Sequence, residues 1–267
     1  MMKRIFSCLL FIVFAPMAQA SEYQFVHSGS LLAHSTVCPA FYPEAVHSGQ
    51  SVDYMIYEVD ETWQKKDMLP ALNEYLSFRS WVEGQVEPEP YSLLERQRGI
   101  FANAYGNDSS YVRQFDLIIN RYVGSIRNIS CLEANLFDQH LVSSDIHKTR
   151  KSEFSAWIFK KGSRLKVIVG LSHDPWIGAP SLENADQWFN KMKSSDWQFY
   201  AFLHNHPFAF RNSYGDIAGT TIPSSPDLRS FKNYFENRSM DLAIITNGFS
   251  SIELTRDDVL QLSATLD

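Results

Sequence analysis

The sequence predicts an α/β fold for residues 146–267, preceded by a mostly helical region over residues 21–145. Two observations support this division. From about Ile146 onward, short apolar runs of strand type alternate with amphipathic segments of helical spacing. Before that point, apolar side chains recur at helical spacing in three successive segments, at 61–84, 92–105 and 109–128. The alternating part has about 120 residues, which is an ordinary size for one domain.

The carboxyl-terminal part contains a regular series of predicted elements. They are strands at 153–159 and 164–171, a helix at 182–193, a strand at 197–203, a helix at 226–238, a strand pair at 241–246 and 250–255, and a short helix from Thr255. Gly162 suits the positive φ of the first hairpin turn. Ser181 is the predicted cap of the first helix, and Pro226 stands near the start of the second. This order predicts a layered arrangement of helices and sheet.

The first twenty residues have the pattern of a secretory signal peptide. Lys3 and Arg4 precede an apolar run too short to span a bilayer, and small residues lead to a predicted cleavage near Ala20. We therefore expect a periplasmic or secreted protein without an integral membrane anchor. Loss of residues 1–20 changes the formal charge from −6 to −8. Such an acidic chain is unsuited to nucleic acid, which requires a basic face.

Cleavage after Ala20 removes Cys8 and leaves two cysteines, Cys38 and Cys131. An even pair in a chain sent to an oxidising compartment predicts a disulfide between them. Two separately buried thiols are the alternative, which the geometry of the pair decides.

The end of the strand at 197–203 carries the candidate metal ligands. His204 and His206 are two residues apart, so in an extended strand their side chains leave the same face and can share one Zn²⁺. A carboxylate as third ligand would leave the fourth position open, as in catalytic zinc sites. Two aspartates, Asp216 and Asp227, follow in the same Ser-x-x-Asp pattern. We favour Asp227, because Pro226 and the helix hold it on a rigid element; Asp216 is the alternative.

These residues together resemble the JAMM, or MPN+, family of zinc metalloproteases. The family signature is a glutamate on an early strand, then HxHP, then SxxD; Glu153, His204-Asn-His206-Pro207 and Ser224-Ser-Pro-Asp227 match it. The resemblance covers about residues 153–255. It implies a JAMM-like, cytidine-deaminase-like α-β-α sandwich with a mixed sheet. The chain departs from the pattern at Ala156, where a glycine is usual, and in a long insert at 208–223 that is predicted to be a lid or a substrate-selecting loop.

The resemblance also implies a reaction. One Zn²⁺ per chain would be held by His204, His206 and Asp227, Glu153 would act as general base, and Ser224 would stabilise the oxyanion. The expected activity is hydrolysis of an amide bond in a peptide or an isopeptide-linked protein. Oligomeric state is not predicted.

Two other functions stay open from the sequence: a non-catalytic binding or scaffold module of the same fold, and an amidase acting on cell-wall peptides. Each site residue also has a structural alternative. Glu153 could form a surface ion pair with Lys151 or Lys160. Ser224 could cap the helix that Pro226 begins, and Asp227 would favour the helix dipole in any case.

Overall fold

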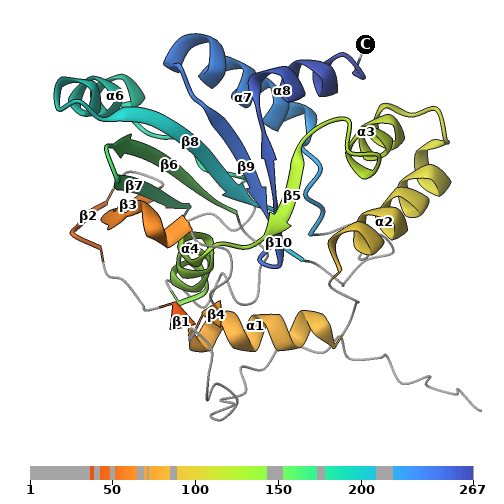
Figure 1. Cartoon of the computed structure of the whole chain (residues 1–267), viewed down its shortest axis with the longest axis horizontal. Coiled ribbons are helices and arrows are strands. Elements are labelled where there is room, and N and C mark those ends of the chain that lie inside the picture. The colour runs from red at the N-terminus through yellow and green to blue at the C-terminus, as the bar shows by residue number, and fades with distance from the viewer. Residues whose placement is uncertain are drawn as a thin grey trace, which may run out of the picture.

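The protein is described by a computed structural model, which covers residues 37–38, 43–48, 52–64, 69–70, 72–84, 89–142, 153–172, 178–208 and 219–266. Helices pack around an eight-stranded sheet (Figure 1). The predicted α/β class is therefore confirmed. The predicted signal peptide and Asp216 lie outside the described residues. In the described part of the chain, no helix combines the length and apolar character needed to cross a membrane.

The large sheet has the strand order β2-β3-β7-β6-β8-β9-β10-β5. Its strands are β2 (Ala45–Ser48), β3 (Val52–Asp60), β5 (Ser125–Asn128), β6 (Phe154–Lys161), β7 (Arg164–Ser172), β8 (Gln198–Asn205), β9 (Leu242–Thr246) and β10 (Ser250–Leu254). Neighbouring strands are antiparallel except for β8 and β9, which are parallel, so the sheet is mixed. Strand β8, which ends at the predicted ligands, lies in the interior of the sheet.

Helices cover both faces of the sheet. One face packs against α2 (Pro90–Tyr105), α3 (Ser110–Ile119), α6 (Ala185–Ser194), α7 (Ser225–Arg238) and α8 (Arg256–Ser263). The other face packs against α1 (Asn73–Glu83) and α4 (Cys131–Val142). Figure 1 shows α4 and α1 below the sheet and α6, α7 and α8 above it. Two apolar cores result, one on each side, and strand residues alternate between them.

The predicted order of elements in the carboxyl-terminal part is confirmed. It appears as β6, β7, α6, β8, α7, β9, β10 and α8. Gly162 has a φ of +59° in the β6–β7 turn, as that hairpin requires. Thr255 caps α8 by accepting a hydrogen bond from the Asp258 N–H.

The predicted cap of α6 is wrong. The helix begins at Ala185, after Asn184, and not at Ser181. The cause is a tertiary contact: the Tyr54 hydroxyl donates to the Ser181 carbonyl (3.1 Å) and accepts from the Glu183 N–H (2.8 Å). Residues 181–183 are therefore held against β3, and the helix starts later.

The helix predicted over 109–128 is also too long. Helix α3 ends at Ile119, and the chain turns through Arg121 (φ +60°) and Gly124 (φ +72°). It continues as β5, where Ile126 pairs with Ile252 of β10. Residues 120–128 therefore form a turn, in which Val123 is buried and Tyr122 is exposed, followed by an edge strand that tertiary packing imposes.

The amino-terminal region is less helical than predicted. It contributes β2, β3 and β5, three of the eight strands of the sheet, and the boundary placed at 145/146 therefore falls within the span of the sheet. The predicted helical segment at 61–84 is divided into a 3-10 helix (Glu61–Gln64), β4 (Leu69–Pro70) and α1. Strand β4 pairs in parallel with β1 (Val37–Cys38). Helix α4 was not predicted.

Cys131 opens α4 and is disulfide-bonded. Cys38 lies in β1, but its side chain is outside the described part of the structure. The pairing of Cys38 with Cys131 stays a prediction.

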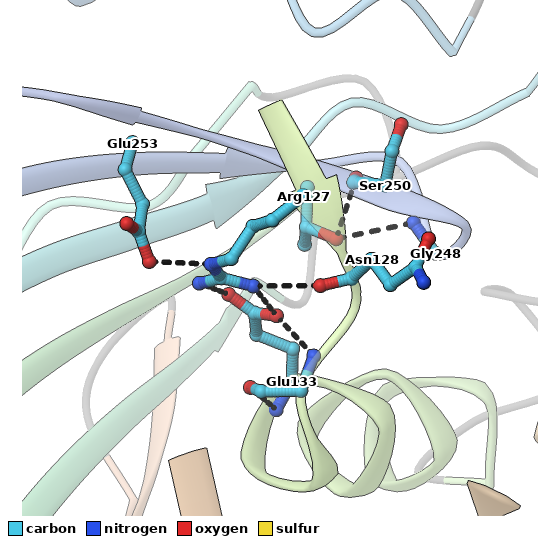
Figure 2. A network of polar contacts seen from close by, with 8 residues as sticks. Arg127, Asn128, Glu133, Gly248, Ser250 and Glu253 are labelled. Atoms are coloured by element: carbon cyan, nitrogen blue, oxygen red, sulfur yellow. Dashed lines mark hydrogen bonds and ion pairs between the residues drawn. The ribbon is translucent and has the colours of Figure 1, made fainter. Parts of the chain in front are cut away.

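A buried ion network fastens the edge strand β5 to the rest of the fold (Figure 2). The Arg127 guanidinium contacts both oxygens of Glu133 in α4, at 2.5 and 2.7 Å, and its Nε donates to Glu253 in β10. The side chains of Arg127 and Glu133 are only 10% and 2% exposed. Burial alone would raise the pKa of Glu133, but the Arg127 charge and hydrogen bonds outweigh it and lower that pKa. Both partners are therefore charged near neutral pH.

We expect Arg127→Ala to lower the free energy of unfolding by about 3–5 kcal/mol, because it leaves the Glu133 carboxylate buried without its partner. Urea unfolding at neutral pH measures this loss. Lys232→Ala is the matched control, since the Lys232–Glu236 pair is exposed (50% and 42%) and should contribute less than about 1 kcal/mol. Equal effects of the two substitutions would contradict the assignment of the network as a structural clamp.

Candidate metal centre

The two predicted histidine ligands lie at the carboxyl end of β8. His204 is fully buried, and its ring lies against Phe202 of the same strand and Phe231 of α7, with centroids 5.8 and 5.7 Å away. His206 follows immediately after the strand, and its N–H continues the ladder by donating to the Thr246 carbonyl (2.9 Å). The His206 side chain is 14% exposed. The pair thus has one buried member and one member that solvent reaches.

Asp227 reaches both histidines from the first turn of α7. The Ser224 Oγ accepts a hydrogen bond from the Asp227 N–H (3.3 Å), and Asp227 Oδ2 accepts one from the Ser224 N–H (2.7 Å). This reciprocal pattern is a capping box. Ser224 therefore does cap the helix, as its structural alternative predicts. This capping is compatible with a ligand role for Asp227, because it holds the Asp227 carboxylate toward the histidines.

The nearest separations among the three ligand groups are close to those around one tetrahedral zinc, with the two histidines facing different oxygens of Asp227. His204 Nε2 and His206 Nε2 are 3.1 Å apart. Asp227 Oδ1 is 3.4 Å from His204 Nε2, and Asp227 Oδ2 is 3.3 Å from His206 Nε2. Ligand atoms each about 2.0–2.1 Å from a tetrahedral centre are about 3.3–3.4 Å from one another. Among the described residues, these three form the one group of potential metal ligands brought together in this way.

A carbonyl on the other side of the ring fixes the orientation of His206. His206 Nδ1 lies 2.8 Å from the Thr220 carbonyl oxygen, which can only accept, so Nδ1 carries the proton. In the neutral ring, Nε2 then presents a lone pair to His204 and Asp227. Metal-binding histidines commonly have such a partner, which sets both the tautomer and the ring angle.

The charges at the site are strongly coupled. Burial alone would raise the pKa of Asp227, but the charge and hydrogen bonds of His204 and His206 outweigh it and hold that pKa well below its ordinary value. Burial alone would lower the pKa of His206, but Asp227, together with the charge of Glu153, raises it. The Asp227 carboxylate is therefore ionised, as a metal ligand must be.

The segment that carries Thr220 is itself held from two sides. Gly219 (φ +76°) lies so close to Phe208 that an added Cβ would be 2.5 Å from the ring. Its carbonyl accepts a hydrogen bond from Asn247 Nδ2 (2.7 Å). Asn247 Oδ1 in turn accepts from the N–H groups of Phe249 and Ser250, both at 2.9 Å. The β9–β10 turn thereby positions the backbone that orients His206.

Glu153 lies next to these ligands, just before β6. Ser155 pairs with His204 across β6 and β8, and the same register continued by two residues places Glu153 opposite His206. The Phe154 N–H donates to Asn205 Oδ1 (2.6 Å), which ties the start of β6 to the end of β8.

An added Cβ at Gly178 would be 3.4 Å from Glu153 Oε2, so the Gly178 backbone leaves room for the carboxylate. Lys160, the described candidate for a Glu153 ion pair, pairs with Glu61 (2.8 Å).

The structure thus brings together His204, His206 and Asp227, with Glu153 and Ser224 alongside. Asp216 and most of the insert, residues 209–218, lie outside the described residues. Sequence reasoning missed three supporting residues: Thr220, Asn205 and Asn247. Thr220 acts through its backbone carbonyl, so the identity of its side chain does not reveal this role. The two buried asparagines each stand at the end of an apolar strand run, which is a usable signal for a polar anchor.

A separate cavity of about 310 Å³ lies on the other face of the sheet. Arg127, Glu133, Tyr200, Leu203 and Ile244 are among the residues that line it. Leu203 and His204 are adjacent in β8 and point to opposite faces. The cavity is therefore separate from the candidate metal centre.

Comparisons of the chain with protein-family models, curated proteins and solved structures each give no match.

We expect Gly219→Ala to weaken zinc binding about 10-fold or more, because the added Cβ would displace either Phe208 or the segment that holds Thr220 against His206. Competition with a fluorescent zinc chelator measures the affinity. Gly162→Ala is the control: it shares a positive φ (+59°) but meets nothing within 4 Å. It should cost about 1–2 kcal/mol of stability and leave zinc affinity unchanged. An unchanged affinity in Gly219→Ala would argue against the orienting role of Thr220.

Proposed function

We propose that the protein is a zinc-dependent peptidase or isopeptidase of JAMM type, which hydrolyses an amide bond. The observation that carries this proposal is the triangle of His204 Nε2, His206 Nε2 and Asp227 carboxylate oxygens, with separations of 3.1–3.4 Å. A JAMM-like arrangement of the α/β sandwich belongs to the same proposal. It is supported by the order of Glu153, HxHP and SxxD along strands and a helix that meet at one edge of the sheet.

Zinc is the metal that the ligand set favours. Two imidazoles and one carboxylate are ligands typical of Zn²⁺, and three protein ligands leave a fourth position for substrate or water. When bound, Zn²⁺ supplies Lewis acidity and lowers the pKa of water from 15.7 to about 7. The 14% exposure of the His206 and Asp227 side chains leaves a side of the site open for approach.

Glu153 is the proposed general base. Its charge already contributes to the raised pKa of His206, which places the carboxylate within electrostatic reach of the ligands. In this role it takes a proton from the attacking water and passes it to the leaving amine. The same residue thus serves as base in one step and acid in the next.

Ser224 is the proposed oxyanion donor. Its Oγ accepts from the Asp227 N–H through a lone pair, so its own hydrogen is still available to a second partner. The capping box fixes the hydroxyl beside the Asp227 carboxylate. A donor held in this way stabilises negative charge that develops on a substrate carbonyl without reorganising during the reaction.

The proposed substrate is a peptide or an isopeptide-linked protein. Removal of the predicted signal peptide would place the enzyme in the periplasm or outside the cell, where such substrates would have to be present. The predicted lid or substrate-selecting role of the 208–223 insert belongs to this proposal. Both described parts of the insert adjoin the site, since Phe208 lies two residues after His206 and the Thr220 carbonyl accepts a hydrogen bond from His206 Nδ1.

We expect the purified protein to bind one zinc per chain, and His206→Ala and Asp227→Asn each to abolish stoichiometric binding. Asparagine at position 227 keeps an oxygen for the Ser224 N–H but removes the ligand charge, so α7 should still form. Metal content by mass spectrometry after dialysis against trace zinc is the measurement.

Two further variants complete this experiment. His47→Ala removes an exposed histidine of β2 outside the ligand group and should retain zinc. Asp216→Ala tests the other acid, and zinc loss in that variant alone would identify Asp216 as the third ligand. Absence of zinc from the wild type would overturn the enzyme and favour a binding module.

We expect Glu153→Gln to retain zinc while hydrolysis falls by about 10²–10⁴-fold, because the amide cannot accept the proton of the attacking water. Cleavage of a library of quenched fluorescent peptides and isopeptides gives the rate, and metal analysis of the same samples gives the occupancy. A zinc-loaded Glu153→Gln protein that cleaves at the wild-type rate would exclude Glu153 as the base.

A further inference from the structure

Two buried polar atoms without hydrogen-bond partners lie on neighbouring strands at the metal centre. Ser155 of β6 and His204 of β8 are both fully buried, and Ser155 Oγ and His204 Nδ1 have no hydrogen-bond partner in the described structure. The two residues are direct partners across the antiparallel β6–β8 pair. An unsatisfied buried polar atom is costly, so the occurrence of two at paired positions requires an explanation.

The two side chains project from directly opposed positions on the same face of the sheet. Directly opposed residues have Cβ atoms about 4.5–5.5 Å apart and project from the same side. A serine Oγ and a histidine Nδ1 each lie close to their own Cβ, so this spacing permits a hydrogen bond between them. His206 and Asp227 lie at the Nε2 side of the His204 ring. Its aromatic contacts within the core are with Phe202 and Phe231, and its partner across the parallel ladder is Ile245.

The protonation of the two histidines shows when the Ser155 hydroxyl would be needed. His206 Nδ1 donates to the Thr220 carbonyl, so neutral His206 presents a lone pair at Nε2. Without a metal, the 3.1 Å contact between the two Nε2 atoms is a hydrogen bond when one of these atoms carries a proton. A metal ligand at His204 Nε2 must lack that proton, and neutral His204 would then carry it at Nδ1. That N–H would be buried and would need an acceptor.

We infer that Ser155 is a positioning residue of the metal centre, whose hydroxyl accepts the Nδ1–H of His204 when His204 binds metal through Nε2. His206 already has the corresponding partner in Thr220, so the proposal gives each histidine ligand one acceptor behind it. The inference rests on the proposed zinc site. It adds a residue that the motif Glu, HxHP and SxxD does not contain.

The test compares Ser155→Ala with Ser155→Thr, which keeps the hydroxyl, in the purified full chain. We expect Ser155→Ala to bind zinc about 10–100-fold more weakly than the wild type, and Ser155→Thr to restore most of the affinity. Thermal unfolding of the metal-depleted proteins provides a second readout. Ser155→Ala should not lower that unfolding temperature, because the substitution removes a hydroxyl that makes no hydrogen bond in the structure.

Ser251→Ala is the matched control. Ser251 of β10 is also fully buried with an unpartnered Oγ, but it points to the opposite face of the sheet, since its neighbour Ile252 belongs to the core on the His204 side. Its removal should leave zinc affinity unchanged. The absorption spectrum of bound Co²⁺ should change in Ser155→Ala and not in Ser251→Ala, because the orientation of one ligand is altered.

The outcomes separate this inference from the proposed function. Zinc affinity of Ser155→Ala within twofold of a zinc-binding wild type would overturn the role of Ser155 and leave the metal centre standing. Equal losses in Ser155→Ala and Ser155→Thr would also overturn it, since packing would then be responsible. A wild type that binds no zinc would overturn the proposed function, and the role of Ser155 with it.

Discussion

The parallel hydrogen-bond ladder between β8 and β9 brings the carboxyl ends of two strands to the same edge of the sheet. His204 pairs with Ile245 and Asn205 with Thr246, and the ladder extends to His206 through the Thr246 carbonyl. Because the register is fixed, the turn that follows β9 lies beside the residues that follow β8. Carboxyl ends of parallel strands are where α/β folds commonly place their sites. The candidate centre depends on this single parallel pairing in an otherwise antiparallel sheet.

The amino-terminal helices support this edge. The Tyr75 hydroxyl of α1 donates to the Gly248 carbonyl (2.7 Å), and burial raises the pKa of that hydroxyl to about 12, so it stays a donor. Phe78 lies against Phe208 and Phe249, with ring centroids 6.2 and 6.0 Å away. A side chain at Gly248 would collide with Phe78. Contacts of α1 thus reach the turn that anchors Gly219, and the region before residue 146 contributes to the site as well as to the sheet.

The sequence predicted the carboxyl-terminal elements well, because each has a local signal: alternating or helical apolar spacing, Gly162 in a turn, Thr255 at a cap. It also placed the ligands on a strand end and a helix start. It failed where the signal is tertiary. Helix α6 starts late because Tyr54, more than a hundred residues away in the sequence, forms a hydrogen bond with the backbone just before the helix. Strand β5 forms because the edge of β10 is available for pairing. The contact of Thr220 with His206 and the proposed role of Ser155 involve atoms that become neighbours only when the chain has folded.

The capping box at the start of α7 has a consequence for how tightly the centre can bind. Asp227 Oδ2 is held by the Ser224 N–H at 2.7 Å, so the carboxylate is placed when the first turn of α7 forms. The conformational entropy of this ligand is then lost during folding and not during ion capture. A third ligand on a free loop would lose that entropy at the moment of binding. Preorganisation of Asp227 would therefore strengthen the affinity of the candidate centre for an ion, and it would make the first turn of α7 and this centre one cooperative unit.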